Sequence, residues 1–344
     1  MPCIIPVGTD IGLSVVACLA ILDLDSIMPI NSDKPHLWKE DVAQSVDLFN
    51  QWFVRFAPKA YRDTRQETTA RVEDALVATE DLASITPVVL KANPQILPTL
   101  RMATCPPLAR DRLIGLSHAN PNLVRGLENG RLPARSDTAV LHAQLNAICS
   151  VIRQMFDRDI FPWLGARTRP TPADRHRAST IVADRLCGAI ADPIIRNAQE
   201  QRQLKCIRSY LEKKGYHMQP PPAGQAPTEM KPGTFSFRTN LVVGKSPRQV
   251  RIPIDVMIQS KNPGRTRMPL LIEAKSAGDF TNTNKRRKEE ATKVHQIRAT
   301  FGERTHFILF LCGYFDSGYL GYEAAEGIDW VWEHRIEDMD RLGI

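Results

Sequence analysis

Asp255, Glu273 and Lys275 are the residues whose types and spacing could support metal-dependent hydrolysis. Asp255 lies in one apolar run, and Glu273 and Lys275 lie two residues apart on the next. Side chains alternate faces along a strand, so Glu273 and Lys275 project on one side while Leu270 and Ile272 project on the other. If the strands are neighbours, Asp255 approaches Glu273, and two carboxylates repel unless a cation or a proton lies between them. The pattern predicts a divalent metal site on a sheet.

The acid-x-lysine triplet alone has little specificity, because it occurs three times, beginning at Glu212, Glu229 and Glu273. Glu212 closes an amphipathic helix, and Glu229 lies in a proline-rich loop. Only Glu273 follows an apolar run typical of a buried strand. The alternative for Glu273 and Lys275 is an ordinary surface ion pair at a strand end, which would have little functional meaning. Asp255 and the flanking pattern favour the metal site.

The composition is that of a globular protein with two domains. The chain has 344 residues, of which 43% are hydrophobic and 24% charged, and its formal net charge is +7. This positive charge favours an acidic partner such as nucleic acid. The seven cysteines are scattered without a C-x-x-C pair, which indicates neither a disulfide framework nor a zinc site and predicts a reducing, cytoplasmic location.

The N-terminus contains an apolar run from Ile11 to Leu22 that is too short to span a bilayer. Asp10 precedes it where a signal peptide would carry positive charge. We therefore expect no membrane segment. Residues 1–27 are treated as an N-terminal extension, with translation from Met28 as an alternative start.

The region 28–195 is predicted to be mainly helical and to serve DNA recognition and dimerisation. Helices are expected over 34–71, 71–83 and 139–160, and the aromatic residues Trp52 and Phe53 fall on a helical stripe typical of core packing rather than base stacking. Between residues 92 and 204 there are fifteen arginines, Arg101 among them, and no lysine. This usage suits contacts with guanine or phosphate, or it reflects codon bias in a GC-rich genome.

The region 196–344 is predicted to follow the order α-β-β-β-α-β. A helix is expected over 198–215, strands over 235–243, 250–258 and 270–275, a helix over 285–301 and a strand over 307–312. A last amphipathic helix is expected over 330–342.

A basic turn opens the predicted helix 285–301, where it opposes the positive end of the helix dipole. A DNA phosphate would compensate this charge, and a solvated charged face is the alternative. The candidate DNA contacts are Asn282, Asn284, Lys285, Arg286, Arg287 and Lys288.

The order of elements, with an acid on one central strand and Glu-x-Lys on the next, resembles the PD-(D/E)xK nuclease superfamily. The runs Gln199-Glu200-Gln201-Arg202, Pro232-Gly233-Thr234-Phe235, Ile252-Pro253-Ile254-Asp255 and Leu271-Ile272-Glu273-Ala274-Lys275-Ser276-Ala277-Gly278-Asp279-Phe280-Thr281-Asn282 resemble the XamI family of type II restriction endonucleases. The resemblance is strongest over 197–335. One departure is Ile254, which stands where the superfamily has proline directly before the first acid.

The resemblance implies cleavage of double-stranded DNA at a short palindrome of the GTCGAC type, with 5′-phosphate and 3′-hydroxyl ends. It implies Mg²⁺, for which Mn²⁺ can substitute, a homodimer and a cognate DNA methyltransferase. Asp255 and Glu273, with the carbonyl of Ala274, would be metal ligands, and Glu200 would match an acid on the preceding helix. Lys275 would orient or deprotonate the attacking water, or stay charged and stabilise the transition state.

Two other functions compete with restriction. One is a DNA-binding protein on a nuclease fold without catalysis, against which the retained Asp255, Glu273 and Lys275 argue. The other is a structure-specific repair nuclease. The large helical first half favours restriction, because reading a target needs surface beyond a minimal nuclease core.

Overall fold

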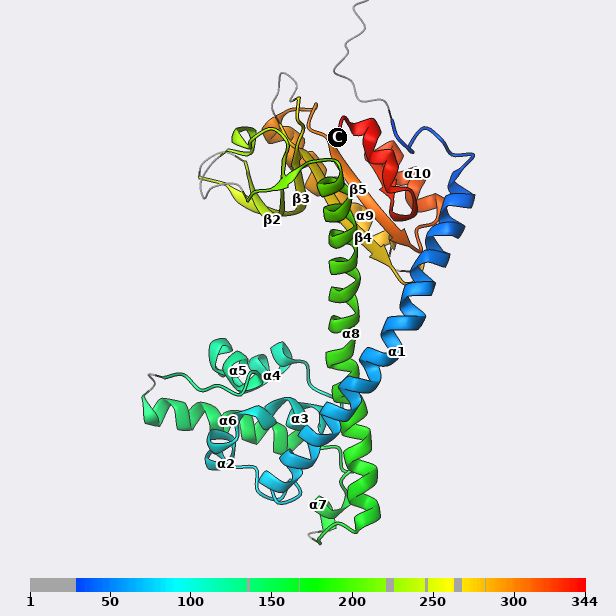
Figure 1. Ribbon diagram of the computed structural model, residues 1–344. Helices are drawn as coiled ribbons and strands as arrows, with labels where there is room; N and C mark the ends of the chain where they lie inside the picture. Colours follow the sequence, from blue (N-terminus) through cyan, green and yellow to red (C-terminus); the bar gives the residue numbers. More distant parts are fainter. Residues whose placement is uncertain are drawn as a thin grey trace, which may run out of the picture.

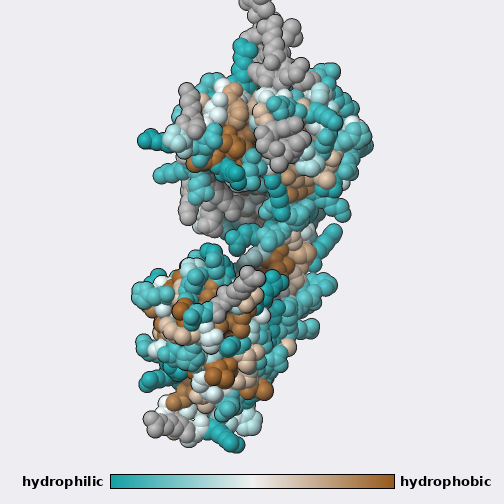
Figure 2. All heavy atoms as spheres, turned by 90° about the vertical axis from the view of Figure 1, so that its left-hand side faces the viewer, coloured by the Kyte–Doolittle hydropathy of each residue, from teal (hydrophilic) through white to brown (hydrophobic). Residues whose placement is uncertain are grey.

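The chain forms two lobes that are joined by two long helices, α1 (Trp38–Ala78) and α8 (Pro172–Lys213) (Figure 1). The computed structural model describes residues 29–134, 137–166, 168–220, 226–244, 247–262, 268–281 and 283–344, without the side chains of 283–287. The expected extension 1–27, with Met28, lies outside the described residues. Figure 2 shows the molecule narrowing to a waist between the lobes.

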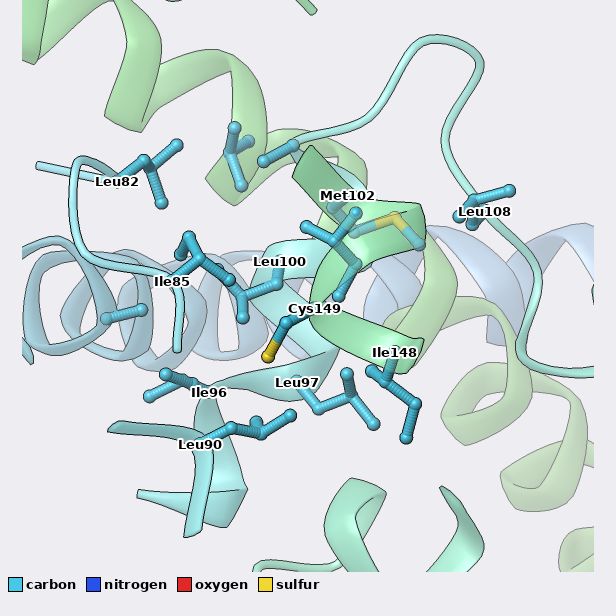
Figure 3. Close-up of a cluster of buried hydrophobic side chains, with 14 of the residues drawn as sticks. Leu82, Ile85, Leu90, Ile96, Leu97, Leu100, Met102, Leu108, Ile148 and Cys149 are labelled. Carbon is cyan, nitrogen blue, oxygen red and sulfur yellow. The ribbon is translucent and has the colours of Figure 1, made fainter. Parts of the chain in front are cut away.

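The first lobe is helical, as the sequence predicts. Its elements are α2 (Pro87–Ala92), η1 (Pro94–Ile96), α3 (Leu97–Met102), α4 (Arg110–Ser117), α5 (Pro121–Glu128), α6 (Thr138–Met155) and α7 (Pro162–Ala166). Leu97, Leu100 and Ile148 are fully buried in its apolar core, where Leu90, Ile96 and Cys149 join them (Figure 3). Cys149 is one of five cysteines in the described part of the chain, and all five are free thiols.

Helix α1 is longer than expected. The predicted break near Arg71 is wrong, because the helix continues without interruption to Ala78. No glycine or proline lies between Pro58 and Thr86, so nothing in the sequence stops the helix there. The backbone leaves the helix after Thr79, where Glu80, Asp81 and Leu82 all adopt positive φ angles.

Helix α8 extends far beyond the predicted helix 198–215, which corresponds to its last part. It begins at Pro172, where proline is favoured, and Thr171 caps it by accepting a hydrogen bond from the Asp174 N–H at 3.1 Å. The helix passes through Pro193, and the boundary expected at 195/196 therefore falls inside it. The two lobes share α8 as a common element.

The second lobe contains, among the described residues, a curled six-stranded sheet with the strand order β1-β2-β3-β4-β5-β6. The strands are β1 (His217–Met218), β2 (Thr234–Val243), β3 (Val250–Gln259), β4 (Leu270–Ala277), β5 (Phe307–Gly313) and β6 (Asp329–Trp332). The pairs β2/β3 and β3/β4 are antiparallel, and β1/β2, β4/β5 and β5/β6 are parallel. The mixed α and β architecture predicted from the sequence is confirmed.

Helices cover both faces of the sheet. The end of α8 and η3 (Glu333–Leu342) pack on one face, with Ile207 and Ile272 in the shared core. On the other face lie α9 (Thr283–Phe301), α10 (Ser317–Ala325) and the start of α1, with Ile297 and Leu309 in the core. The short η2 (Pro227–Glu229) precedes β2. None of the helices in the described ranges is long and apolar enough to cross a membrane.

The predicted helix 330–342 is wrong in its first part. Residues 329–332 form β6, and a 3-10 segment, η3, follows. Trp330 and Trp332 are buried in the core on the α9 side, and Val331 is buried in the core on the α8 side. This period of two belongs to a strand with both faces covered, which a short apolar run does not distinguish from a helix.

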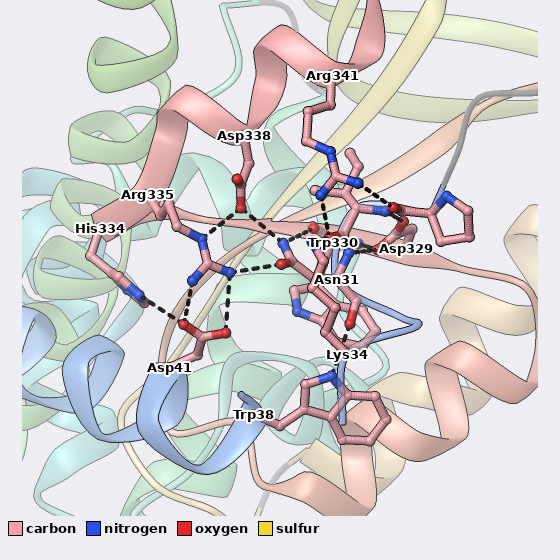
Figure 4. Close-up of polar contacts among 12 residues, drawn as sticks. Asn31, Lys34, Trp38, Asp41, Asp329, Trp330, His334, Arg335, Asp338 and Arg341 are labelled. Carbon is pink, nitrogen blue, oxygen red and sulfur yellow. Dashed lines mark hydrogen bonds and ion pairs between the residues drawn. The ribbon is translucent and has the colours of Figure 1, made fainter. Parts of the chain in front are cut away.

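A polar cluster fixes the segment before α1 to the C-terminal part of the chain (Figure 4). Arg335 donates hydrogen bonds to both carboxylate oxygens of Asp41, at 2.6 and 3.1 Å, and to the Asn31 side chain at 2.7 Å. Asn31 in turn donates to the carbonyl of Trp330 at 2.8 Å. Because Asp41 is buried and pairs with the Arg335 guanidinium, these bonds hold α1 against the sheet.

Gly313 lets α1 approach the end of β5. Its φ of +102° and a Cβ position only 2.1 Å from the Ala277 carbonyl oxygen exclude any larger residue. Its N–H donates to the Ser45 hydroxyl on α1 at 2.7 Å. The helix is thereby anchored beside the end of β4, the strand that carries Glu273 and Lys275.

Candidate active site

Asp255 lies where β3 bends away from β4. Ile254 and Val256 are two residues apart but are buried in opposite cores, so β3 changes face at Asp255. The register pairs Phe237 with Val256 and Thr239 with Ile254, and Arg238, between these two β2 residues, adopts a left-handed φ of +52°. The β3/β4 ladder ends at the pair Val256 and Ile272.

Beyond this pair the backbone of β3 no longer bonds β4, and the Asp255 carboxylate accepts a hydrogen bond from the Ala274 N–H at 2.9 Å. In a strand, the N–H and C=O of one residue point to the same side, so the Ala274 carbonyl is directed towards Asp255. Asp255 and Ala274 are therefore brought together, as the metal-site prediction requires.

Glu273 and Lys275 project from the same face of β4, and their side chains form an ion pair at 3.1 Å. Leu270, Ile272 and Ala274 pack against the opposite core, which confirms the predicted alternation. The second carboxylate oxygen of Glu273 accepts a hydrogen bond from Lys293 on α9 at 2.5 Å. The Glu273 side chain is only 12% exposed, so this arrangement is not an ordinary surface pair.

The charges of the site oppose one another. Burial and the negative charge of Glu273 raise the pKa of Asp255 to about 6. Burial by itself would lower the pKa of Lys275, but the carboxylates of Glu273 and Glu290 outweigh it and leave that pKa raised. Glu273 thus destabilises a second negative charge on Asp255 while it stabilises the positive charge on Lys275.

The donor atoms fit a hard divalent cation. Such ions prefer carboxylate and carbonyl oxygens, and Asp255, Glu273 and Ala274 offer both kinds. A cation beside Asp255 would relieve the repulsion that raises its pKa. In the parts of the chain that the structure describes, no three histidine, cysteine or acidic side chains are arranged to hold a metal ion by themselves, so the backbone and water would complete the coordination.

Glu200 lies on α8, and its side chain forms an ion pair with Arg238 at 2.7 Å. Arg238 lies between Phe237 and Thr239, the β2 partners of the two residues that flank Asp255. Among the described residues, Glu200 makes no hydrogen bond to Asp255, Glu273 or Lys275. The structure therefore places Glu200 beside the bend of β2 and β3. It contacts Arg238 and not the two predicted metal ligands, Asp255 and Glu273.

The candidate DNA contacts at the start of α9 are placed only in part. Asn282 lies outside the described residues, and for Asn284, Lys285, Arg286 and Arg287 only the helical backbone is described. Lys288 is exposed on the same helix. The assignment of this turn to DNA therefore stays a prediction.

Sequence reasoning missed Lys293 and Glu290, both on α9. Lys293 bonds Glu273 and also the carbonyl of Pro253 at 2.6 Å, which ties α9 to both central strands. Glu290 lies 3.5 Å from the Lys275 ammonium group. A signal was present, because Glu290 falls on the apolar stripe of Val294 and Ile297, at helical spacing.

Gln203, which was also missed, braces β4 from the other face of the sheet. Its side-chain amide donates to the carbonyls of Lys275 and Phe310, at 3.2 and 3.3 Å. Gln203 is 1% exposed and lies on the buried face of α8. It therefore fixes the backbone of the strand that carries Lys275.

The aromatic stripe on α1 is only partly core. Trp52 is half-buried and stacks on Phe56 with ring centres 5.3 Å apart. The Arg202 guanidinium lies over the Trp52 ring, 5.6 Å from its centre. Phe53 is 41% exposed, so its prediction as a packing residue is wrong. The helix leaves the sheet at this point, and its outer face meets no other described element.

Several arginines of the helical lobe have structural partners. Arg101, one of the fifteen arginines in the lysine-free stretch, is buried and pairs with Glu128 at 2.6 Å, so it does not belong to a DNA-facing surface. By contrast, Arg112, Arg125 and Arg131 are exposed and form no ion pair with a described residue. They remain candidates for contact with a polyanion.

Comparison with known proteins defines the class to which this site belongs. A family model described as XamI restriction endonuclease matches residues 80–332, which is more than half of the chain. The chain therefore belongs to the XamI restriction endonuclease family, as its sequence motifs predict. It is an enzyme, a nuclease of the restriction type.

A curated relative with a similar sequence is the type II restriction enzyme SalI of Streptomyces albus G. It is 56% identical over 314 residues, which cover 91% of this chain and 99% of that enzyme. Among solved structures, protein VC1899 from Vibrio cholerae aligns with a TM-score of 0.28 and 11% identity, over 83% of this chain and 56% of that chain. The last likeness is too low to support a conclusion about the fold.

Proposed function

We propose that this chain is a type II restriction endonuclease with a PD-(D/E)xK core, which hydrolyses double-stranded DNA at a short palindrome of the GTCGAC type. The proposed products have 5′-phosphate and 3′-hydroxyl ends, and the proposed cofactor is Mg²⁺, with Mn²⁺ as a substitute. The observation that carries this proposal is the Asp255 carboxylate bonded to the Ala274 N–H, beside Glu273 and Lys275. It brings together an acid and a Glu-x-Lys triplet from two strands.

Asp255, Glu273 and the carbonyl of Ala274 would hold the metal ion. Bound Mg²⁺ supplies positive charge to the phosphoryl oxygens and lowers the pKa of the attacking water. Lys293 orients Glu273 by bonding its second oxygen, and the Ala274 N–H orients Asp255. These contacts fix the ligands before DNA binds, which limits the reorganisation that the reaction requires.

Lys275 is proposed to act as a positive charge on the phosphate rather than as a general base. It lies between the carboxylates of Glu273 and Glu290, at 3.1 and 3.5 Å, and both favour its protonated form. A protonated ammonium group stabilises negative charge that develops on the phosphoryl oxygens. Glu200 has a supporting role in this proposal, through Arg238.

The division of labour follows the two lobes. Residues 196–344 are proposed as the nuclease domain, and residues 28–195 as the region for DNA recognition and dimerisation. Helices α4 and α5 form the side of the helical lobe that is turned towards the sheet lobe (Figure 1). Arg112 on α4 and Arg125 on α5 are exposed. A palindromic target requires two-fold symmetry, hence a homodimer, and the host DNA would be protected by a cognate methyltransferase.

The test is digestion of a fully sequenced, unmethylated phage DNA by the purified protein with Mg²⁺, followed by sequencing of the ends. We expect discrete fragments whose ends share one palindrome, and no cleavage with a chelator or by Lys275→Ala. A binding protein without activity would leave the DNA intact with either Mg²⁺ or Mn²⁺. A repair nuclease would cut only damaged or branched DNA, and either result would refute the proposal.

A further inference from the structure

Two neighbouring buried acids, one of which contacts Lys275, come from different helices, and the proposed reaction does not use them. Glu290 on α9 is 2% exposed, and Glu323 on α10 is fully buried. Glu290 approaches the Lys275 ammonium group with one carboxylate oxygen, at 3.5 Å, and accepts a hydrogen bond from the Tyr319 hydroxyl with the other, at 2.6 Å. Glu290 therefore bridges the outer helices and the catalytic strand.

Glu323 pairs with no positively charged side chain in the described ranges. Neither of its oxygens meets the full geometry of a hydrogen bond there, although Glu290 and Tyr319 are both near enough to influence its charge. A buried, unpaired carboxylate is strongly unfavourable. Burial and the negative charge of Glu290 raise the pKa of Glu323 to about 9, so the carboxyl group is neutral at pH 7.

The position of Lys275 explains what such a pair could do. Its ammonium group contacts Glu273 on its own strand and Glu290 on α9. In the proposed function, Glu273 is a metal ligand, so its carboxylate must serve the cation as well as Lys275. Glu290, which has no role in metal binding, is the contact that keeps Lys275 in place.

We infer that Glu290 is a positioning residue for Lys275, and that the buried Glu323 next to Glu290 carries a proton. Two neighbouring buried carboxylates would repel each other, and one proton removes that repulsion. This inference rests on the proposed function, because Lys275 matters only if the site cleaves DNA. It makes no change to the proposed metal ligands.

The decisive comparison is Glu290→Gln against Glu323→Gln, because both changes preserve size and remove one possible charge. For Glu290→Gln we expect kcat to fall on the order of tenfold to hundredfold, while KM and the affinity for DNA stay unchanged, since a displaced catalytic group costs rate rather than binding. For Glu323→Gln, which mimics the protonated acid, we expect a loss of no more than about threefold. Glu289→Gln, at an exposed position on α9, and Glu326→Gln, at the exposed C-cap of α10, are the controls.

Two further measurements keep the test independent of folding and of turnover. Glu290→Asp retains the charge on a shorter side chain, and its kcat should lie between those of the parent enzyme and Glu290→Gln. At pH 7.5 the infrared spectrum of the parent should contain a protonated carboxyl band that Glu323→Gln lacks. Unchanged kcat in Glu290→Gln, equal losses in the two glutamine variants, or the absence of that band would overturn the inference. A parent enzyme that cuts no DNA would instead refute the proposed function.

Discussion

In the described part of the helical lobe, the buried Arg101 and the half-buried Arg185 each have an acid partner. Arg101 bonds both carboxylate oxygens of Glu128, at 2.6 and 2.7 Å, and Arg185 bonds Asp157 at 3.1 Å. One cation faces one anion, and the guanidinium geometry suits a bidentate pair. These contacts connect segments that are 27 and 28 residues apart, so they fix the lobe internally.

The sheet lobe groups its charges differently. At the candidate site, the described acids outnumber the lysines: Asp255, Glu273 and Glu290 lie near Lys275 and Lys293, and Glu323 adjoins Glu290. The pKa values of Asp255 and Glu323 are raised as a result, which means that folding brings these acids together at a cost in stability. Ion pairs of one cation and one anion therefore indicate a structural role. A group of like charges without enough partners indicates a functional site that binds a ligand or substrate.

The largest expected effect concerns the acid that contacts both lysines. Glu273→Ala should lower cleavage on the order of a thousandfold or more, because it removes a metal ligand and a partner of Lys275 together. Cleavage of a target-containing plasmid measures the effect, with circular dichroism as the check on folding. Glu229→Ala, in the equivalent triplet of the exposed loop, is the matched control and should retain full activity. Equal losses of cleavage in both variants would contradict the assignment of the Glu273 triplet, and not the Glu229 triplet, to the active site.

The next effect is on stability in the helical lobe. Glu128→Gln leaves the buried guanidinium of Arg101 without a charged partner and should lower the free energy of unfolding by about 3 kcal/mol. Glu67→Gln, which removes the exposed partner of Arg71, should cost about 0.5 kcal/mol or less. Chemical denaturation of both variants tests this difference. A negligible effect of Glu128→Gln would mean that these ion pairs do not hold the lobe together.

In the sheet lobe, neutralising an acid should raise the free energy of unfolding instead of lowering it. The raised pKa of Asp255 means that the folded protein holds an extra proton between about pH 4 and pH 6, so stability falls as the pH rises through this window. Asp255→Asn keeps an acceptor for the Ala274 N–H but does not titrate. Without metal at pH 7.5 it should be more stable than the parent by about 1–2 kcal/mol, with little difference below pH 4.

The companion measurement adds Mg²⁺ to both proteins. The parent should gain stability with rising Mg²⁺, because the ion binds the folded site, whereas Asp255→Asn should gain little and should not cut DNA. Thermal unfolding with a chelator and then with Mg²⁺ gives both results. A variant that is less stable than the parent at pH 7.5 would show that Asp255 is a structural acid after all.

What the sequence could reveal depended on whether the signal was local. The strands around Asp255 and Glu273 were predicted nearly to the residue, because an apolar run between turns specifies a buried strand. The pairing of Glu273 with Lys275 followed from the period of two alone. Lys293 and Glu290 were missed because they reach the site from α9, and a helix shows its buried stripe but not its partner strand.

The errors have the same origin. Whether residues 329–332 form a strand or a helix depended on a sixth position in the sheet, beside β5, that only the tertiary fold provides. Arg101 could not be separated from exposed arginines without knowledge of Glu128, 27 residues away. The partner of Glu200 depended on the left-handed conformation of Arg238, which a non-glycine residue rarely adopts.

The smallest expected effect tests whether an unpaired charge also marks a DNA-binding surface in the helical lobe. Arg125 is exposed and has no ion pair with any residue that the structure describes, while Arg71 is exposed and paired with Glu67 at 2.5 Å. If α5 contacts the DNA backbone, Arg125→Ala should weaken binding several-fold and reduce the slope of log affinity against log salt by about 1. Arg71→Ala should change neither quantity. Titration of a labelled duplex at several salt concentrations measures both quantities. An unchanged slope for Arg125→Ala would show that this unpaired arginine of the helical lobe does not contact the DNA backbone.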